Sequence, residues 1–377
     1  MKKFLALLLA LVMVFALAAC GTDDPGNATT DPNAGESTPA ESTNGESLGY
    51  VGISMPTQSL ERWNRDGAFL RDQFEASGYK AELLYANNEV DQQVSDIQNL
   101  IADGVNLLVI SAIDGESLNT VVDEAAENGI PVIAYDRLLT GTKNVDYYTT
   151  FDNYGVGVIQ GQYIVDRFDL ENAEGPFTIE FTGGSPDDNN AGLFFSGAYD
   201  TLKPYIDAGK LVVTSGQVDF ETVATPAWKS ETAQARMDNI LSAYYPDALT
   251  GGTTLDICLC SNDSTALGVT NSLVSFGFTA ENIPVITGQD CDIPNTKNMI
   301  SGLQAMSVFK DTRTLADQTM KMVADILAGN TPETNATYDN GVMEVPSYNC
   351  TPVFADASNY KELLIDSGYY TEADLAE

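Results

Sequence analysis

Residues 107–137 read LLVISAIDGESLNTVVDEAAENGIPVIAYDR, and this stretch contains one complete strand–helix–strand unit. Leu107–Ile110 and Pro131–Tyr135 are continuous apolar runs, as expected for parallel strands that helices cover on both faces. Between them, the apolar residues of 118–125 recur at helical spacing, and an Asn-Gly pair follows as a typical helix end. The stretch therefore predicts a parallel sheet of the doubly wound type.

The same alternation continues on both sides of this unit. Upstream, strands are expected at Tyr50–Ser54 and Lys80–Tyr85, with a helix over 59–76 between them; downstream, a strand is expected at Tyr147–Phe151. The pattern then starts again. The strands expected in this second series are Phe177–Phe181, Leu211–Thr214, Leu255–Leu259, Pro284–Thr287 and Ala305–Phe309. Two similar α/β lobes follow from the repetition.

The C-terminal part of the chain is too small for a domain of its own. A helix over 312–327 precedes short strands near 342–345 and 353–355, which we expect to complete both sheets. The predicted fold class is α/β, with two doubly wound parallel-sheet lobes joined by a multi-crossover hinge. The first lobe is predicted to comprise 48–151 plus 310–340, and the second 152–309 plus 341–377.

The N-terminus reads as an export signal. Lys2 and Lys3 precede an apolar run from Phe4 to Ala19, which is shorter than a membrane span, so 1–19 is predicted to be a signal peptide. The sequence LAACG at 17–21 resembles the bacterial lipobox, which implies lipid on Cys20 and an extracytoplasmic, membrane-anchored protein. Ordinary secretion is the alternative. Residues 20–47, rich in Thr, Ser, Pro and acidic groups, are expected to form a disordered acidic tether.

Composition removes several classes of function. The chain has 54 acidic and 18 basic residues, a net charge of −36, so nucleic acid is not an expected partner. It has no histidine, which excludes Ser-His-Asp and Cys-His catalysis and any histidine metal site. No cofactor or metal is predicted. Buried thiols are favoured for Cys258, Cys260, Cys291 and Cys350, with a Cys260–Cys291 disulfide as the alternative.

Polar side chains follow many of the predicted strands, at the edge where ligands bind in doubly wound sheets. They include arginines, carboxylates and amides, which suit the hydroxyls of a sugar, and the two tryptophans suit its C–H faces. Structural ion pairs and core tryptophans are the competing interpretation at each single position. The agreement of many strand ends favours a ligand site in a cleft between the lobes.

Several segments resemble known sugar receptors. From about Leu48 to Tyr370, motifs such as SLERW, IPVIAYDRLL, GGSPDDNNA, TGQD and VFKDTRTLA resemble ChvE-type multiple-sugar receptors and D-xylose-binding proteins. The resemblance implies a type 1 periplasmic-binding fold and a non-enzymatic, monomeric substrate-binding component of an ABC transporter. The expected partners are a monosaccharide and a permease with its ATPase. The ligand-binding residues that the resemblance implies are Arg62, Trp63, Asp136, Arg137, Asn189, Asn190, Trp228, Asn262, Asp290 and Lys310.

The motifs leave the sugar open between xylose-like and glucose- or galactose-like monosaccharides. SLERW and Ser261-Asn262-Asp263 are closer to the xylose receptors, whereas SPDDNNA and FKDTR are closer to the ChvE type. A sensory receptor for another small polyol or a quorum signal would use the same strand ends. A surface glycosidase would need two carboxylates, for which Asp136 and Asp290 are the candidates, but neither lies in a glycosidase motif.

Overall fold

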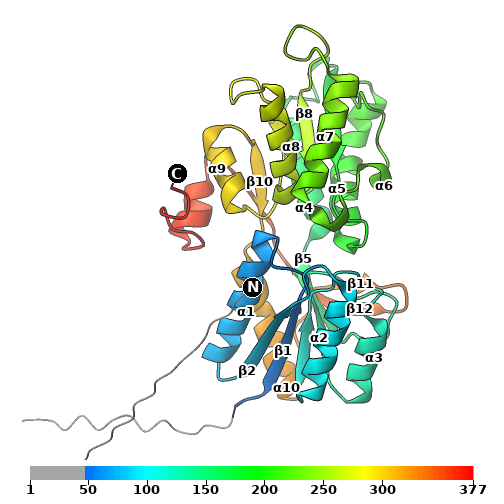
Figure 1. Cartoon of the computed structure of the whole chain (residues 1–377), viewed down its shortest axis with the longest axis vertical. Coiled ribbons are helices and arrows are strands. Elements are labelled where there is room, and N and C mark those ends of the chain that lie inside the picture. The colour runs from blue at the N-terminus through cyan, green and yellow to red at the C-terminus, as the bar shows by residue number, and fades with distance from the viewer. Residues whose placement is uncertain (1–46, 377) are drawn as a thin grey trace, which may run out of the picture. The chain divides into compact units, whose positions relative to one another are not determined.

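The computed structural model describes residues 47–376. The first lobe is built on a sheet of seven strands in the order β11-β12-β5-β4-β3-β1-β2 (Figure 1). Every neighbouring pair is parallel except β11 and β12. The strands are β1 (Tyr50–Met55), β2 (Lys80–Tyr85), β3 (Leu107–Ile110), β4 (Val132–Tyr135), β5 (Tyr147–Phe151), β11 (Ala336–Asp339) and β12 (Glu344–Cys350).

Helices cover both faces of this sheet, which explains its uninterrupted apolar strands. In β4, Val132 and Ala134 belong to one buried cluster, and Ile133 and Tyr135 belong to another. Because successive side chains of a strand point to opposite faces, a strand that is buried on both faces has to be apolar throughout. The covering helices are α1 (Glu61–Ala76), α2 (Val90–Ala102), α3 (Asn119–Glu127) and α10 (Thr312–Leu327).

The second lobe contains a four-stranded parallel sheet in the order β7-β6-β8-β9. An antiparallel pair, β10 with β13, adjoins it through a bridge between Gln289 and Val308. The strands are β6 (Phe177–Thr182), β7 (Leu211–Val212), β8 (Ile257–Cys260), β9 (Val285–Ile286), β10 (Met306–Phe309) and β13 (Val353–Asp356). The helices are α4 (Asn153–Arg167), α5 (Asn189–Asp207), α6 (Phe220–Val223), α7 (Ser230–Tyr244), α8 (Asp263–Phe276) and α9 (Ile293–Ser301), with short turns at Pro226–Trp228 and Lys361–Asp366.

Close packing of α4 against α5 fixes the position of the N-terminal end of α5. A Cβ added at Gly157 would lie 2.1 Å from the carbonyl oxygen of Phe194, and one at Gly197 would lie 2.1 Å from that of Tyr154. Only glycine permits backbones to approach so closely. These contacts hold α5 with its N-terminus toward the first lobe.

The chain passes between the lobes three times, after β5, after β10 and after β12. One predicted boundary is wrong. Residues 341–377 were expected in the second lobe, but Glu344–Cys350 pairs with β5 and β11 in the first-lobe sheet, and only β13 and the residues after it join the second lobe. Strand β11 was not predicted. The parallel pairing of Ser347–Cys350 with β5 supplies the hydrogen bonds that place this segment in the first lobe.

Several predictions concern residues that the structure does not describe. The signal peptide at 1–19, the lipid on Cys20 and nearly all of the tether at 20–47 lie outside the described residues. Within 47–376, no helix combines the length and the apolar character that a membrane crossing requires. Cys258, Cys260, Cys291 and Cys350 are all buried free thiols, so the alternative of a Cys260–Cys291 disulfide is wrong.

Candidate functional site

A cavity lies where the polar ends of the strands of both lobes meet. Its empty volume is about 420 Å³, counting space open to solvent. Its lining comes from the segments that follow β1, β4, β6, β7, β8, β9 and β10, as the carboxyl-end rule for doubly wound sheets requires. The lining residues are Leu60, Arg62, Trp63, Asp136, Arg137, Asp188, Asn190, Phe194, Trp228, Asn262, Ser264, Gln289, Asp290, Asp292 and Lys310.

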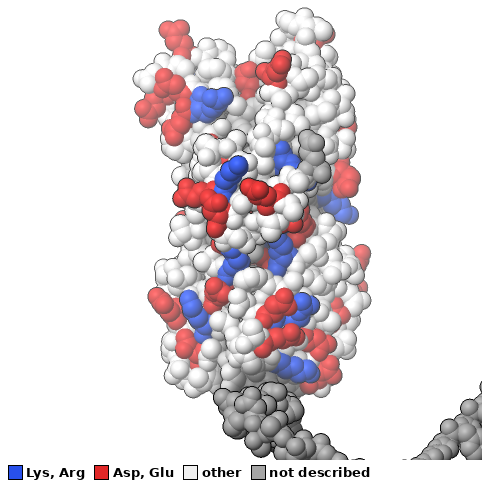
Figure 2. Space-filling model, turned by 90° about the vertical axis from the view of Figure 1, so that its left-hand side faces the viewer, with Lys and Arg blue, Asp and Glu red and all other residues white. Residues whose placement is uncertain are grey.

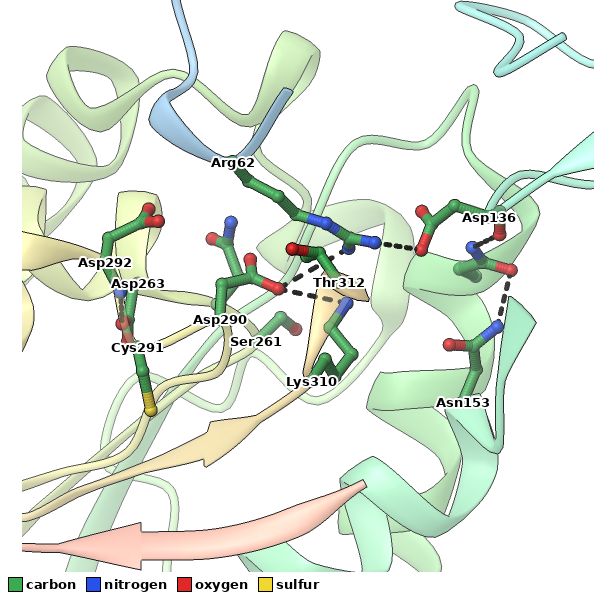
Figure 3. A network of polar contacts seen from close by, with 12 residues as sticks. Arg62, Asp136, Asn153, Ser261, Asp263, Asp290, Cys291, Asp292, Lys310 and Thr312 are labelled. Carbon is green, nitrogen blue, oxygen red and sulfur yellow. Dashed lines mark hydrogen bonds and ion pairs between the residues drawn. The ribbon is translucent and has the colours of Figure 1, made fainter. Parts of the chain in front are cut away.

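Arg62 stands at the centre of a buried charge network (Figure 3). Its guanidinium is ion-paired with Asp136, lies 3.2 Å from Asp66 through Nε, and reaches Asp290 of the second lobe at 3.5 Å. Lys310 Nζ lies 3.0 Å from the same oxygen of Asp290. Burial by itself would raise the pKa of Asp290, but Lys310 and Arg62 hold it below its ordinary value. Asp290 is therefore a carboxylate, able only to accept hydrogen bonds.

Arg137 is held from both lobes. Its Nη1 donates to the carbonyl oxygen of Ala112 at 3.1 Å, and its Nε lies 3.0 Å from a carboxylate oxygen of Asp188, as an ion pair without hydrogen-bond alignment. Asp188 also caps α5 by accepting from the backbone N–H of Asn190 at 3.0 Å. Burial raises the pKa of Asp188, and Arg137 opposes this rise. The planar guanidinium is thus fixed in orientation before any ligand arrives.

Aromatic rings line the cavity from both lobes. The indole of Trp63 lies near two guanidiniums, with its centroid 5.0 Å from the Arg62 carbon and 5.1 Å from the Arg137 carbon. The indole of Trp228 packs edge-on against Phe194 and above Gly184, where an added Cβ would lie 2.0 Å from the ring. Its Nε1–H has no hydrogen-bond partner among residues 47–376, although a buried indole N–H usually finds one.

Asn190 ties the N-terminus of α5 to the first lobe. Its amide donates to the backbone carbonyl of Asp136 at 2.6 Å and accepts from the amide of Asn153 at 2.9 Å. Asp136, Trp228 and Asp290 all have positive φ angles, of 60°, 56° and 98°. Such backbone costs about 1–3 kcal/mol per residue and concentrates at functional sites. Three of the residues that line the cavity therefore have strained backbone.

Nine of the ten residues predicted for the site line this cavity, and Asn189 does not. Asn189 is exposed, because α5 begins there and its neighbour Asn190 occupies the buried face of the first turn. Asn189 or Asn190, or both, had been predicted, and only Asn190 lines the cavity.

Six lining residues were not predicted. Asp188 and Gln289 lie in polar loops that follow predicted strands, so the sequence placed them near the site. It did not indicate that their side chains line the cavity. Asp292 and Ser264 lie two residues beyond Asp290 and Asn262, and no pattern distinguishes them. Phe194 follows Asn190 by one helical turn, a signal that required the start of α5 to be known. Leu60 is apolar and resembled an ordinary packing residue.

The charge on the outer surface is mixed on the face that Figure 2 shows. Lys and Arg side chains lie singly among Asp and Glu there and do not form a continuous basic strip. This face carries no electrostatic footprint of the kind that a phosphate backbone requires.

Residues 51–331 match the model of a periplasmic binding protein domain. The chain is 49% identical over 326 residues to the multiple sugar-binding periplasmic receptor ChvE of Rhizobium radiobacter, covering 85% of this chain and 91% of the receptor. It is 34% identical over 326 residues to the D-xylose-binding periplasmic protein of Escherichia coli, covering 86% and 92%. A solved ABC transporter solute-binding protein from Clostridium phytofermentans, with β-D-glucose bound, is 56% identical, with a TM-score of 0.84 over 87% of this chain and all of that one.

Proposed function

The chain belongs to the periplasmic binding protein family, and from this we propose that it is an extracytoplasmic receptor that carries a monosaccharide to an ABC transporter permease. The observation that carries the proposal is the cavity between the lobes, in which the Arg62–Asp290–Lys310 network faces aromatic rings from both sides. The ligand proposed is an aldopentose or aldohexose. The β-D-glucose bound by the solved relative makes glucose the first sugar to test.

The chemistry of the lining fits a sugar ring. Each sugar hydroxyl both donates and accepts, and the cavity offers fixed donors on Arg137 and Lys310 and a fixed acceptor on Asp290. Charge-assisted hydrogen bonds are about twice as strong as neutral ones, so a few of them position an uncharged ligand firmly. The indoles of Trp63 and Trp228 supply apolar plates for the C–H faces of the ring.

Binding is proposed to proceed by closure of the lobes. Arg62, Trp63, Asp136 and Arg137 come from the first lobe, and Asn190, Trp228, Asn262 and Asp290 come from the second. A sugar that contacts both sets stabilises the closed state by its additional affinity for that state. The closed surfaces would then dock on the permease.

Calorimetry with purified residues 47–377 tests the proposal. Glucose, galactose and xylose are titrated into the native protein and into Arg137→Ala and Trp228→Ala. Each substitution should weaken binding by at least tenfold while the circular dichroism spectrum is retained, because each removes a side chain from the cavity wall. Unchanged affinity in both variants would contradict the site. Absence of heat with all monosaccharides in the native protein would contradict the function.

A receptor for another polyol or a signalling molecule is the second candidate, because the same cavity would serve it. A thermal-shift screen with inositols, sugar alcohols and sugar acids beside the monosaccharides separates the two. Glycoside hydrolysis by the carboxylate pair that the sequence offered, Asp136 and Asp290, is not favoured, because a general acid needs a raised pKa and the pKa of Asp290 is lowered. Release of reducing sugar from a disaccharide by the purified protein would reverse that judgement.

The lipid anchor on Cys20 is also part of the proposal. A tether at 20–47 would leave the folded lobes free to reach a permease in the same membrane. In cells fed a labelled fatty acid, the native protein should carry label and Cys20→Ala should not. Equal labelling of both proteins would show that the lipid is elsewhere.

A further inference from the structure

A second contact between the lobes lies at the edge of the cavity and is centred on Arg65, whose partner Asp292 is a lining residue. Arg65 is one turn beyond Arg62 on α1, in the first lobe, and its Nη2 lies 2.9 Å from Asp292 Oδ1 at the N-terminus of α9, in the second. Its guanidinium carbon lies 5.5 Å and 5.3 Å from the ring centroids of Tyr369 and Tyr370 in the C-terminal segment. Arg65 does not line the cavity.

The residues around Arg65 come from both lobes. On the first-lobe side, Glu61 is ion-paired with Arg65 and also accepts from the backbone N–H of Ile293 at 3.3 Å. On the second-lobe side, the hydroxyl of Tyr370 donates to the carbonyl oxygen of Cys291 at 2.9 Å, which fixes the aromatic pair beside the loop that carries Asp290. Every partner of Arg65 outside α1 is therefore attached to the second lobe.

This contact is less exposed to solvent than a typical surface ion pair. The side chains of Arg65 and Asp292 are 21% and 13% exposed, whereas the Arg71–Asp72 pair farther along α1 is 41% and 64% exposed. A partly desolvated ion pair is screened less by salt, and the aromatic rings add a cation–π contribution.

We propose that Arg65 is a positioning residue for sugar binding: it holds the two lobes in the arrangement that assembles the cavity, without contacting the sugar. The proposal rests on the sugar-binding function above. Because Arg65 does not line the cavity, the contact sets the population of the binding-competent arrangement for every ligand equally. The apparent dissociation constant is the intrinsic one divided by that population, so loss of Arg65 should weaken all sugars by one common factor. A residue that touches the sugar would instead change the ranking of sugars.

The experiment compares Arg65→Ala, Arg65→Lys and the native protein with at least three sugars that the native protein binds. Arg65→Ala should raise every dissociation constant by about tenfold, which is the loss expected for one partly exposed charge-assisted hydrogen bond. The factor should be the same for every sugar within error. In stopped-flow measurements the dissociation rate should rise, because the contact forms between closed lobes. Arg65→Lys should restore part of the affinity, since a lysine can pair with one carboxylate but lacks the planar fork.

Arg71→Ala is the matched control, because it removes an arginine and an ion pair from the same helix without any partner on the second lobe. It should bind sugars like the native protein. The urea midpoint of each variant shows that the protein under titration is folded. Unchanged affinity in Arg65→Ala, or losses that differ between sugars, would overturn the inference. A native protein that binds no sugar would instead overturn the proposed function.

Discussion

Replacing Asp290 by asparagine should separate what its charge contributes from what its shape contributes. Asparagine keeps the volume and one carbonyl oxygen of the side chain but removes the negative charge that Lys310 meets at 3.0 Å and Arg62 meets at 3.5 Å. Lys310 is only 2% exposed, so its ammonium would be left buried beside a neutral group. Binding and stability should therefore both change.

The two magnitudes follow from the environment of the pair. Breaking a buried ion pair by removing one partner costs about 3–5 kcal/mol, and because the amide oxygen still accepts a hydrogen bond we expect the free energy of unfolding to fall by about 3 kcal/mol. A charge-assisted hydrogen bond to a sugar hydroxyl would become a neutral one, and the link from Arg62 to the second lobe would weaken. The dissociation constant for sugar should rise by roughly ten- to a hundredfold.

Urea unfolding and calorimetry measure the two effects on the same preparations. Asp72→Asn is the control, because its partner Arg71 lies on the surface and exposed ion pairs contribute about 0–1 kcal/mol. That variant should match the native protein in both assays. If Asp290→Asn bound sugar with native affinity, the carboxylate would not be a ligand group. If its stability were unchanged, the burial of Lys310 would not depend on Asp290.

Three further outcomes are expected. Gly184→Ala should weaken sugar binding at least tenfold, because the new methyl group displaces the Trp228 ring, whereas Gly192→Ala, which meets no atom within 4 Å, should bind normally; equal affinities would contradict this. Burial raises the pKa of Asp66 to about 6 and of Asp292 to about 7, so between about pH 4 and pH 7 the folded chain binds more protons than the unfolded one. Stability should therefore fall as pH rises through that window, and a urea midpoint that instead increased from pH 5 to pH 7.5 would refute the assignment. The four cysteines between 258 and 350 should resist a thiol reagent at pH 8 until urea exposes them, since burial also raises their thiol pKa values.

The first lobe could be predicted largely from local sequence. Strands at Lys80–Tyr85, Leu107–Ile110 and Tyr147–Phe151 were expected with the bounds that the structure has. Their apolar runs are unambiguous because helices cover both faces. In the second lobe, the strand expected at 211–214 is shorter than predicted. It covers only Leu211–Val212, since pairing with β6 ends there.

Local sequence patterns could not predict which distant segments pair as neighbouring strands. The placement of β12 beside β5 depends on hydrogen bonds to a strand made much earlier in the chain. Pro346, which lacks an N–H group, further weakens the strand signal just before that pairing begins.

Site residues that directly follow a strand could be predicted from the sequence. Site residues whose side-chain direction depends on where a helix starts could not. Asp136 and Arg137 directly follow β4, a strand end where polar side chains were expected, and the family resemblance implied their role. The choice between Asn189 and Asn190 depended on Asp188 being the cap of α5. The role of Arg65 depends on a partner far along the chain, which no spacing along α1 reveals.

The position of β12 inside the first-lobe sheet has a consequence for how the protein is made. The strands β1 to β5 leave the ribosome early, but the sheet they belong to is completed only when Glu344–Cys350 has been synthesised. The first lobe cannot finish folding as an independent N-terminal unit, and contacts of such long range form slowly. The nascent chain would therefore remain incompletely folded until nearly all of it exists.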